Sequence, residues 1–218
     1  MRTLELLKIR ENIYAFLARM YLEEPPKKLA EDIANKRLPL PEELSALNTD
    51  LREGFSLIKK FESEFTGSAD ELYEDLKEEY TRLFIGPSED AILPYESSYV
   101  EKTFTGKAVL NAKENYRKAG IEKVEACNEP EDHVALELDF MAYLCRGMTE
   151  KLKGDEKIKR ELAIQHEFLD GCLAKWVPQF CEDIIKSPNS NFYKGVAKIT
   201  KGFLVFDSSM MDEISAMA

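Results

Sequence analysis

The sequence predicts an all-α fold in which packed helices form one domain. Apolar residues recur every three or four positions along most of the chain, as at Leu6, Ile9, Ile13 and Leu17, and this spacing gives a helix one apolar face. No stretch alternates apolar and polar residues for long enough to form a sheet. A chain of 218 residues with 44% hydrophobic content can bury one large core, so a single domain is expected.

Prolines, glycines and capping residues mark the ends of the first helices. Pro25-Pro26 ends the first one, and Pro41 suits the first position of another, whose middle Gly54 weakens. Ser68 and Glu71 form a capping box, in which each side chain accepts a hydrogen bond from a backbone amide that has no partner inside the helix. The expected helices before this box cover residues 3–22, 28–36 and 41–65.

The same signals divide the second half of the chain. Gly120 suits the C-terminal cap of a helix over residues 106–119. An almost wholly apolar helix begins at Pro130 and is expected at the centre of the bundle. Pro178 must kink or restart the long helix that follows, because it removes one backbone hydrogen bond. The predicted domain covers residues 1–206 and leaves a polar, methionine-rich C-terminal tail at 207–218.

Charge limits the classes of partner. The formal net charge is −11, and no run of basic residues occurs, so nucleic acid is not expected as a partner. An acidic surface attracts cationic segments and raises their encounter rate. A solvated acidic face explains the charge equally well.

The N-terminal segment argues against export and membrane insertion. Glu5, Lys8 and Arg10 interrupt its apolar pattern, which is unlike a signal peptide. No uncharged apolar run approaches the roughly 20 residues of a membrane span. We therefore expect a cytoplasmic protein with no membrane span.

The residues of common catalytic and metal sites are missing or wrongly spaced. The four cysteines have no CxxC spacing and only two histidines accompany them, which argues against zinc. Cys145, Cys172 and Cys181 fall within apolar helical patterns and are expected to be buried. The patterns GxxxxGK[ST], GxGxxG and GxSxG are absent. We expect no enzyme activity, no metal and no cofactor.

Residues 80–99 form the stretch around which the chain is organised. Tyr80, Leu83 and Phe84 continue the buried stripe of the helix that the capping box opens. Gly86 and Pro87 then stop this helix, since glycine tolerates the left-handed cap and proline cannot continue the helix. We therefore expect Gly86 at positive φ, where it would aim the following loop.

The loop after this corner presents aromatic, acidic and hydroxyl groups. Proline restricts the residue before it to an extended conformation, so the loop should run outward at this point. A loop pinned by its own aromatic side chains explains the pattern as well as a binding loop does. The residues concerned are Pro94, Tyr95, Glu96, Ser97 and Tyr99.

A second informative stretch covers residues 129–144. Pro130 suits the first helical position and Asp132 the third, where a carboxylate meets free amides. His133 needs a partner there, and Glu137 lies one turn away. This pair suits structural or recognition use, although a general base or half a metal site stays open. His166 is expected to be a buried core histidine.

Together the two stretches resemble the TorD/DmsD family of redox-enzyme maturation chaperones. The motif Tyr-x-x-Leu-Phe-x-Gly-Pro is met by Tyr80, Leu83, Phe84, Gly86 and Pro87, and Pro-Tyr-x-Ser-x-Tyr by Pro94, Tyr95, Ser97 and Tyr99. The motif Glu-Pro-x-Asp-His followed by Glu-Leu-x-Phe is met by Glu129, Pro130, Asp132, His133, Glu137, Leu138 and Phe140. Trp176 departs from the pattern, since some relatives place tryptophan near the loop.

The resemblance implies a cytoplasmic chaperone for a molybdenum enzyme of anaerobic respiration. Such a protein binds the twin-arginine leader or the apo catalytic subunit until the cofactor is inserted, and then releases it for export. The chain has no Arg-Arg pair of its own, so it is not expected to be an exported client. The client is not specified, and a homodimer stays open.

The leader would need acids for its arginines and an apolar slot for its short apolar segment. Asp132, with Glu129, Glu96 and Glu89, is the expected arginine contact, in one groove with His133 and the corner. The slot is assigned to Leu83, Phe84, Leu93 and Tyr95. Two other classes stay open: an adaptor that grips a folded subunit without reading a leader, and a nucleotide-dependent enzyme.

Overall fold

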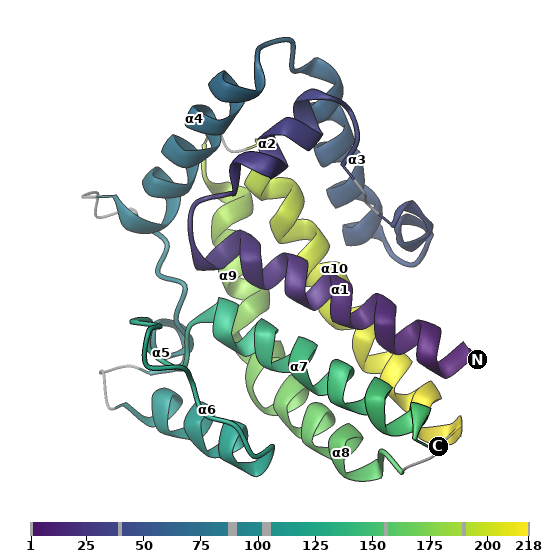
Figure 1. Cartoon of the computed structure of the whole chain (residues 1–218). Coiled ribbons are helices and arrows are strands. Elements are labelled where there is room, and N and C mark those ends of the chain that lie inside the picture. The colour runs from purple at the N-terminus through teal and green to yellow at the C-terminus, as the bar shows by residue number, and fades with distance from the viewer. Residues whose placement is uncertain are drawn as a thin grey trace. The chain divides into compact units, whose positions relative to one another are not determined.

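The computed structural model describes residues 2–38, 41–86, 91–101, 106–154, 157–188 and 191–217. In these ranges the chain is helical and contains no strand, which confirms the predicted all-α class. The α-helices are α1 (Arg2–Leu22), α2 (Lys27–Ala34), α3 (Thr49–Glu64), α4 (Ala69–Tyr80), α5 (Glu96–Val100), α6 (Lys107–Lys118), α7 (Val134–Lys153), α8 (Lys159–Phe168), α9 (Ala174–Lys186) and α10 (Asn191–Met217), with a 3₁₀ helix at Glu42–Ala46 and π-helical segments at Thr81–Ile85 and Leu169–Leu173 (Figure 1).

Local end signals explain where several helices begin and end. The capping box of α4 forms as predicted, with Ser68 Oγ 3.2 Å from Glu71 N and Glu71 Oε2 2.7 Å from Ser68 N. Gly120 follows α6 with a φ of +79°, the left-handed conformation expected of a glycine cap. The long helix predicted from Pro41 is instead divided, because Asn48 accepts a hydrogen bond from Leu51 N and starts α3 anew.

The chain forms two compact units, each built from segments that are distant in sequence. Unit 1 comprises Met1–Leu22, Pro94–Val177 and Leu204–Ala218, and unit 2 comprises Glu23–Leu93 and Pro178–Phe203. The region predicted as a single domain therefore contains two units. The long helices α9 and α10 each contribute residues to both of them.

In unit 1, α7 lies along α1 (Figure 1). Most of α7 is buried, as predicted for a central helix, and Leu138, Met141 and Cys145 are fully inaccessible. Near its C-terminal end an apolar cluster joins α1, α7, α8 and the end of α10. Its buried members are Leu7, Met148, Ile158, Leu162, Met210 and Ile214.

The C-terminal residues are part of α10, which runs to Met217. Asp207, expected to begin a polar tail, is fully buried and accepts hydrogen bonds from Arg10 Nη2 at 2.9 Å and Tyr14 Oη at 2.7 Å. Met211 is also buried. The boundary predicted at residue 207 thus falls inside a helix, because a buried ion pair with α1 fixes the segment that composition alone presents as polar.

In unit 2, α3 and α10 approach closely at glycines. A Cβ atom on Gly54 would lie 2.8 Å from Ile199 N and 2.9 Å from Gly195 O. Gly54 was expected to weaken its helix, but its lack of a side chain permits this contact. The two helices can pack this closely because Gly54 has no side chain where the backbone and side chain of Ile199 lie.

Two further sequence expectations concern helix continuity and membrane insertion. Ala174, the first residue of α9, carries the carbonyl that Pro178 leaves without its helical donor. A π-helical segment directly precedes Ala174, and Pro178 lies inside α9 with helix on both sides of it, so the kink or restart predicted at Pro178 stays a prediction. Within the described ranges, no helix combines the length and the apolar character that crossing a bilayer requires.

Candidate functional site

The predicted site residues are divided between the two units. Tyr80, Leu83, Phe84 and Gly86 belong to unit 2, whereas the residues from Pro94 to Tyr99 and from Glu129 to Glu137 belong to unit 1. Pro87 and Glu89 lie outside the described residues.

In unit 2, the aromatic residues of the first motif are part of the core. Tyr80, Leu83 and Phe84 are 4%, 2% and 7% exposed. The Phe84 ring lies 5.1 Å from that of Tyr80 and 5.4 Å from that of Tyr193, in an edge-on contact with the latter. These side chains hold the end of α4 against α10 and leave little of their own surface for a ligand. Ile85, which is 63% exposed, is the accessible apolar residue of this turn.

Gly86 does not have the positive φ that we expected. Its φ and ψ are −47° and 160°, and its N–H donates to Thr81 O at 2.7 Å, which closes a π-helical turn. A Cβ atom on Gly86 would lie 3.3 Å from Thr81 O. The prediction failed because a π turn ends the helix here in place of a left-handed cap.

In unit 1, the loop from Pro94 is joined to the segment before α7 by backbone hydrogen bonds. Val134 N donates to Pro94 O at 2.8 Å and Glu96 N donates to Asp132 O at 2.9 Å, on either side of an isolated antiparallel bridge between Tyr95 and His133. These bonds bring together the segment that follows Pro94 and the segment that precedes α7, which lie more than thirty positions apart in sequence.

Asp132 fastens this loop with its side chain. Its Oδ2 atom accepts a hydrogen bond from Ser97 N at 3.0 Å. The helix α7 begins at Val134 and not at Pro130, so the predicted third-position role of Asp132 is wrong. Its partner is the first turn of α5, whose free amides attract a carboxylate for the same physical reason.

His133 is the N-cap of α7, and its Nδ1 atom accepts a hydrogen bond from Ala135 N at 3.1 Å. The side chain is almost fully buried, and the Tyr95 ring contacts it edge-on with centroids 5.2 Å apart. Burial lowers the pKa of His133 to about 4, despite the nearby carboxylates of Glu129 and Asp132 that raise it. The imidazole is therefore neutral near pH 7 and caps a helix, which removes the need for Glu137 as its partner.

Glu137 accepts instead from Trp176, whose Nε1 lies 3.0 Å from Glu137 Oε2. Both side chains are fully buried, and the Trp176 ring lies against that of Tyr99 with centroids 5.4 Å apart. The sequence marked Trp176 as a departure from the family pattern and gave it no polar partner. A buried tryptophan needs a hydrogen-bond acceptor for its indole N–H, and this need was the signal that could have indicated a polar partner for Trp176.

Three buried carboxyl groups meet here, and we call Glu96, Asp132 and Glu137 the Glu137 cluster. Their residues are 4%, 1% and 0% exposed. Each has one oxygen without a hydrogen-bond partner among the described residues, namely Glu96 Oε2, Asp132 Oδ1 and Glu137 Oε1. Such atoms are costly to bury, so the cluster has fewer donors than its acceptors require.

Proton binding relieves part of this deficit. Burial raises the pKa of Glu137 well above its ordinary value of 4.5, and repulsion from Glu96 raises it further. Burial also raises the pKa of Glu96, which lies within hydrogen-bonding reach of Glu137. Since neither ionised group can donate, a proton on Glu137 gives Glu96 a donor. Asp132 Oδ1 gains nothing from that proton.

The accessible part of this region lies around Glu129. Its Oε2 atom accepts a hydrogen bond from Tyr95 Oη at 2.8 Å, and both side chains are half-buried. Tyr116 Oη donates to Glu131 O at 2.8 Å and thereby holds the same turn from α6. Pro130 is exposed.

Among the remaining singled-out residues, Cys172 lies near the Glu137 cluster, since the charges of Glu137 and Glu96 act on its thiol. Cys145, Cys172 and Cys181 are buried as predicted, and burial raises the pKa of the Cys145 thiol to about 11 and that of Cys172 to about 12. His166 is not a core residue: its side chain is 43% exposed and lies 3.0 Å from Asp170. The buried stripe of α8 passes through its neighbours and leaves His166 on the solvent side.

Comparison with known sequences identifies a family. Residues 41–182, well over half of the chain, match the family model described as nitrate reductase delta subunit. The chaperone protein TorD of Vibrio cholerae is 28% identical over 141 residues, which cover 64% of each chain. TorD of Aliivibrio fischeri is 30% identical over 135 residues, 61% of this chain and 62% of that protein. The chain thus spans less than two thirds of these relatives.

Two matches that cover more of the chain indicate the same family. TorD of Aliivibrio salmonicida is 25% identical over 205 residues, 91% of this chain and 92% of that protein. A crystal structure from Archaeoglobus fulgidus, described as a candidate redox enzyme maturation protein, has a TM-score of 0.51 and 25% identity, with 90% of this chain and 94% of that one covered. The curated relatives are named as chaperones and not as catalysts, in agreement with the expectation of a protein that is not an enzyme. The chain belongs to the nitrate reductase delta subunit family, the TorD-like family of redox-enzyme maturation proteins.

Proposed function

We propose that this protein is a cytoplasmic chaperone that binds the twin-arginine leader and the apo form of a molybdenum-containing oxidoreductase subunit before its export. Family membership and the names of the curated relatives support the chaperone class. The leader as ligand is supported by the chemistry of unit 1, where the second motif and the Pro94 loop meet.

The observation that carries this proposal is the donor deficit of the Glu137 cluster. A proton shared between Glu137 and Glu96 leaves Asp132 Oδ1 as the buried oxygen that still has no partner among the described residues, so a cation with several donors would be stabilised there. A guanidinium group offers several N–H donors in one plane and can bind a carboxylate through two of them. An ammonium group has no such planar arrangement, which is the physical basis for preferring arginine to lysine.

Access to the cluster determines the order of contacts. Glu129 is half-buried, whereas Asp132 is 1% exposed. We therefore propose that a leader arginine first displaces Tyr95 from Glu129 and then reaches Asp132 Oδ1 beneath it. In this scheme His133 stays neutral and holds the start of α7, so it adds no repulsive charge.

Calorimetric titration of a twin-arginine peptide and its twin-lysine counterpart tests this scheme. Asp132→Asn and Glu129→Gln should each weaken the arginine peptide by roughly ten-fold to a hundred-fold, because a hydrogen bond to a charged group contributes about 1.5 to 3 kcal/mol. The lysine peptide should bind more weakly to the parent and lose less. Glu125→Gln is the matched control, since Glu125 is an exposed acid of the connection before this turn.

Each outcome of the titration has a distinct meaning. An equal loss for both peptides would show general charge attraction in place of arginine recognition. An unchanged affinity in Asp132→Asn would restrict Asp132 to fastening Ser97. If neither peptide binds but the apo subunit does, the chain is an adaptor that grips its client without reading a leader.

A further inference from the structure

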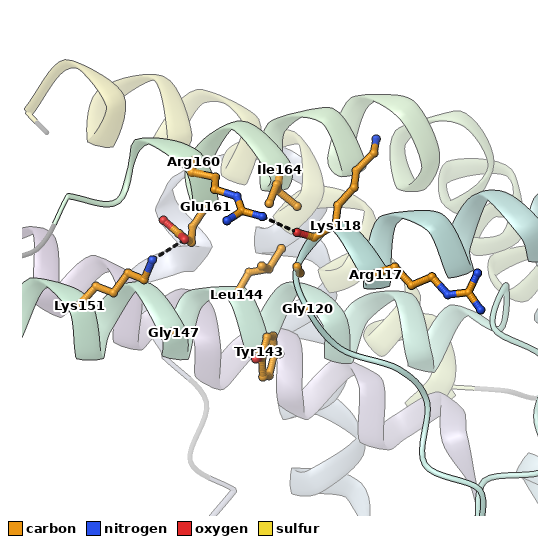
Figure 2. A pocket seen from close by; sticks show the side chains of 11 residues that line it. Arg117, Lys118, Gly120, Tyr143, Leu144, Gly147, Lys151, Arg160, Glu161 and Ile164 are labelled. Carbon is orange, nitrogen blue, oxygen red and sulfur yellow. Dashed lines mark hydrogen bonds and ion pairs between the residues drawn. The ribbon is translucent and has the colours of Figure 1, made fainter.

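A pocket of about 310 Å³ lies in unit 1 where α6, α7 and α8 meet. Figure 2 shows its floor, formed by Leu144 and Ile164, with Gly120 at the end of α6 on one side. Tyr143, which is 41% exposed, lies at another edge. None of these residues belongs to the Glu137 cluster or to the motifs of the proposed leader site.

The lining of this pocket is basic although the chain as a whole carries a net charge of −11. Four of its side chains are cationic and one is acidic. They come from three helices: Arg117 and Lys118 from α6, Lys151 from α7, and Arg160 and Glu161 from α8.

Arg160 and Lys151 are the cations placed to act in the pocket. Arg160 extends from α8 toward the end of α6, where its Nη2 atom donates to Lys118 O at 3.0 Å (Figure 2). This bond fixes the guanidinium group, whose charge also acts on the neighbouring Glu161, but no carboxylate of the described residues forms an ion pair with it. Lys151 is held by Glu161 at 2.6 Å, while Arg117 points away from the other side chains in Figure 2.

We propose that this pocket binds a small anionic group, a phosphate or a carboxylate, through Arg160 and Lys151. Both groups have donors left after their recorded bonds, since an arginine has several N–H groups and a lysine ammonium has three. Both are held by neighbouring atoms, so little side-chain freedom is lost on binding. The volume lies at the lower end of the range for small-molecule sites, which suits a compact ligand.

Two features oppose an anion and limit its affinity. The Glu161 carboxylate lies in the pocket, and its Oε2 atom is buried without a hydrogen-bond partner among the described residues, although Lys151 binds Oε1 and holds the pKa of Glu161 below the usual range against the effect of burial. The carbonyl groups at the end of α6 carry a partial negative charge, which the Arg160 guanidinium offsets. Arg160 and Lys151 carry two positive charges and Glu161 carries one negative charge, so these three side chains leave a net positive charge in the pocket.

Gly147 offers a direct test, because it lines the pocket and a Cβ atom there would meet nothing within 4 Å. Gly147→Glu and Gly147→Gln add side chains of equal size that differ in charge, and both should fold, since either residue favours a helix more than glycine does. The carboxylate introduced by the first lies one turn before Lys151 and competes with the anion.

The experiment is an NMR titration of the intact protein with inorganic phosphate and, separately, with glutarate, at constant ionic strength. Parent protein should bind at least one probe saturably, with shifts at Gly147 and Arg160. Gly147→Glu should weaken that binding by at least roughly ten-fold relative to Gly147→Gln. Phosphate alone or glutarate alone would identify the ligand chemistry.

Arg160→Gln should also weaken binding, whereas Lys159→Gln, an equal loss of charge on the same helix outside the pocket, should not. Circular dichroism of each variant checks that α6 stays folded without the Arg160 bond. The proposal is overturned if neither probe binds saturably, or if the two Gly147 variants bind equally. Neither result bears on leader binding, which uses different residues.

Discussion

Unit 1 contains two buried groups of charged residues that differ in how fully their atoms are paired. In the Asp207 cluster, formed by Arg10, Tyr14 and Asp207, both carboxylate oxygens accept hydrogen bonds, and Arg10 Nη1 is the one side-chain atom of the three without a partner in the described part of the chain. In the Glu137 cluster, three acids meet and, among the described residues, one oxygen of each has no hydrogen-bond donor, although the charge of Lys175 acts on Glu96. Burial of charge alone therefore does not indicate function, and the feature that separates the two clusters is the shared lack of donors on which the proposed leader site rests.

The largest expected effect is on the paired cluster. Asp207→Ala should lower the free energy of unfolding by about 3 to 5 kcal/mol, because it leaves the Arg10 guanidinium buried without its carboxylate. Urea denaturation followed by circular dichroism measures this loss. The double variant Arg10→Met with Asp207→Leu should recover most of it, since a buried ion pair can be replaced by packed apolar groups. A loss below 1 kcal/mol in the single variant would remove the contrast between the clusters.

A smaller effect of opposite sign is expected in the Glu137 cluster. Glu137→Gln keeps an acceptor for Trp176 and supplies a permanent donor to Glu96, so at pH 8 it should raise the free energy of unfolding by about 1 kcal/mol. Glu150→Gln on the exposed side of α7 is the control and should change little.

The gain in the free energy of unfolding from Glu137→Gln should increase as pH rises. Because the pKa of Glu137 is raised in the folded chain, the folded state binds the proton more tightly than the unfolded state does. The stability from this proton is complete below the ordinary pKa of 4.5 and is lost as pH rises through the raised pKa. The advantage of Glu137→Gln over the parent should therefore widen with rising pH. The pKa of His133 is lowered to about 4 in the folded chain, so its contribution to stability changes with pH in the opposite direction. This contribution cancels in the comparison because both proteins contain His133. A constant difference would show that Glu137 holds no extra proton.

The smallest effect is expected for an exposed pair, which shows the part that burial plays in this comparison. His166 and Asp170 lie 3.0 Å apart with side chains 43% and 54% exposed. Asp170→Asn should change the free energy of unfolding by at most about 0.5 kcal/mol, because water screens exposed pairs. The same denaturation assay measures it. A loss as large as that of Asp207→Ala would mean that pairing and not burial sets the magnitude.

Helix positions and short-range end signals could be predicted from the sequence, because their partners lie within a few residues. The Ser68–Glu71 box and the left-handed Gly120 are examples. Gly86 was misjudged by the same reasoning, since a glycine after a helix is compatible with a left-handed cap or with a close carbonyl. The hydrogen bond from Gly86 N to Thr81 O, five residues earlier, decides between them, and no residue type in this stretch distinguishes that π turn from a left-handed cap.

Contacts in the candidate site were beyond prediction where the partner is distant in sequence. Asp132 and Glu137 were identified as site residues, but their partners Ser97 and Trp176 lie 35 and 39 positions away. Local reasoning therefore gave Asp132 a role in α7 and paired Glu137 with His133. Which hydrogen bonds a buried acid makes depends on the packing of other helices, and that information is not local.

The bond between Trp176 and Glu137 has a spectroscopic consequence. Trp176 is the only tryptophan in the chain, so the intrinsic emission excited at the red edge of the indole band belongs to one known side chain. Its N–H donates to the carboxyl group that gains or loses the proton, and its ring lies against Tyr99 of α5, just after Pro94. The wild-type protein therefore carries a dye-free optical probe at the centre of its acidic cluster, and changes in charge or loop position there fall within its range.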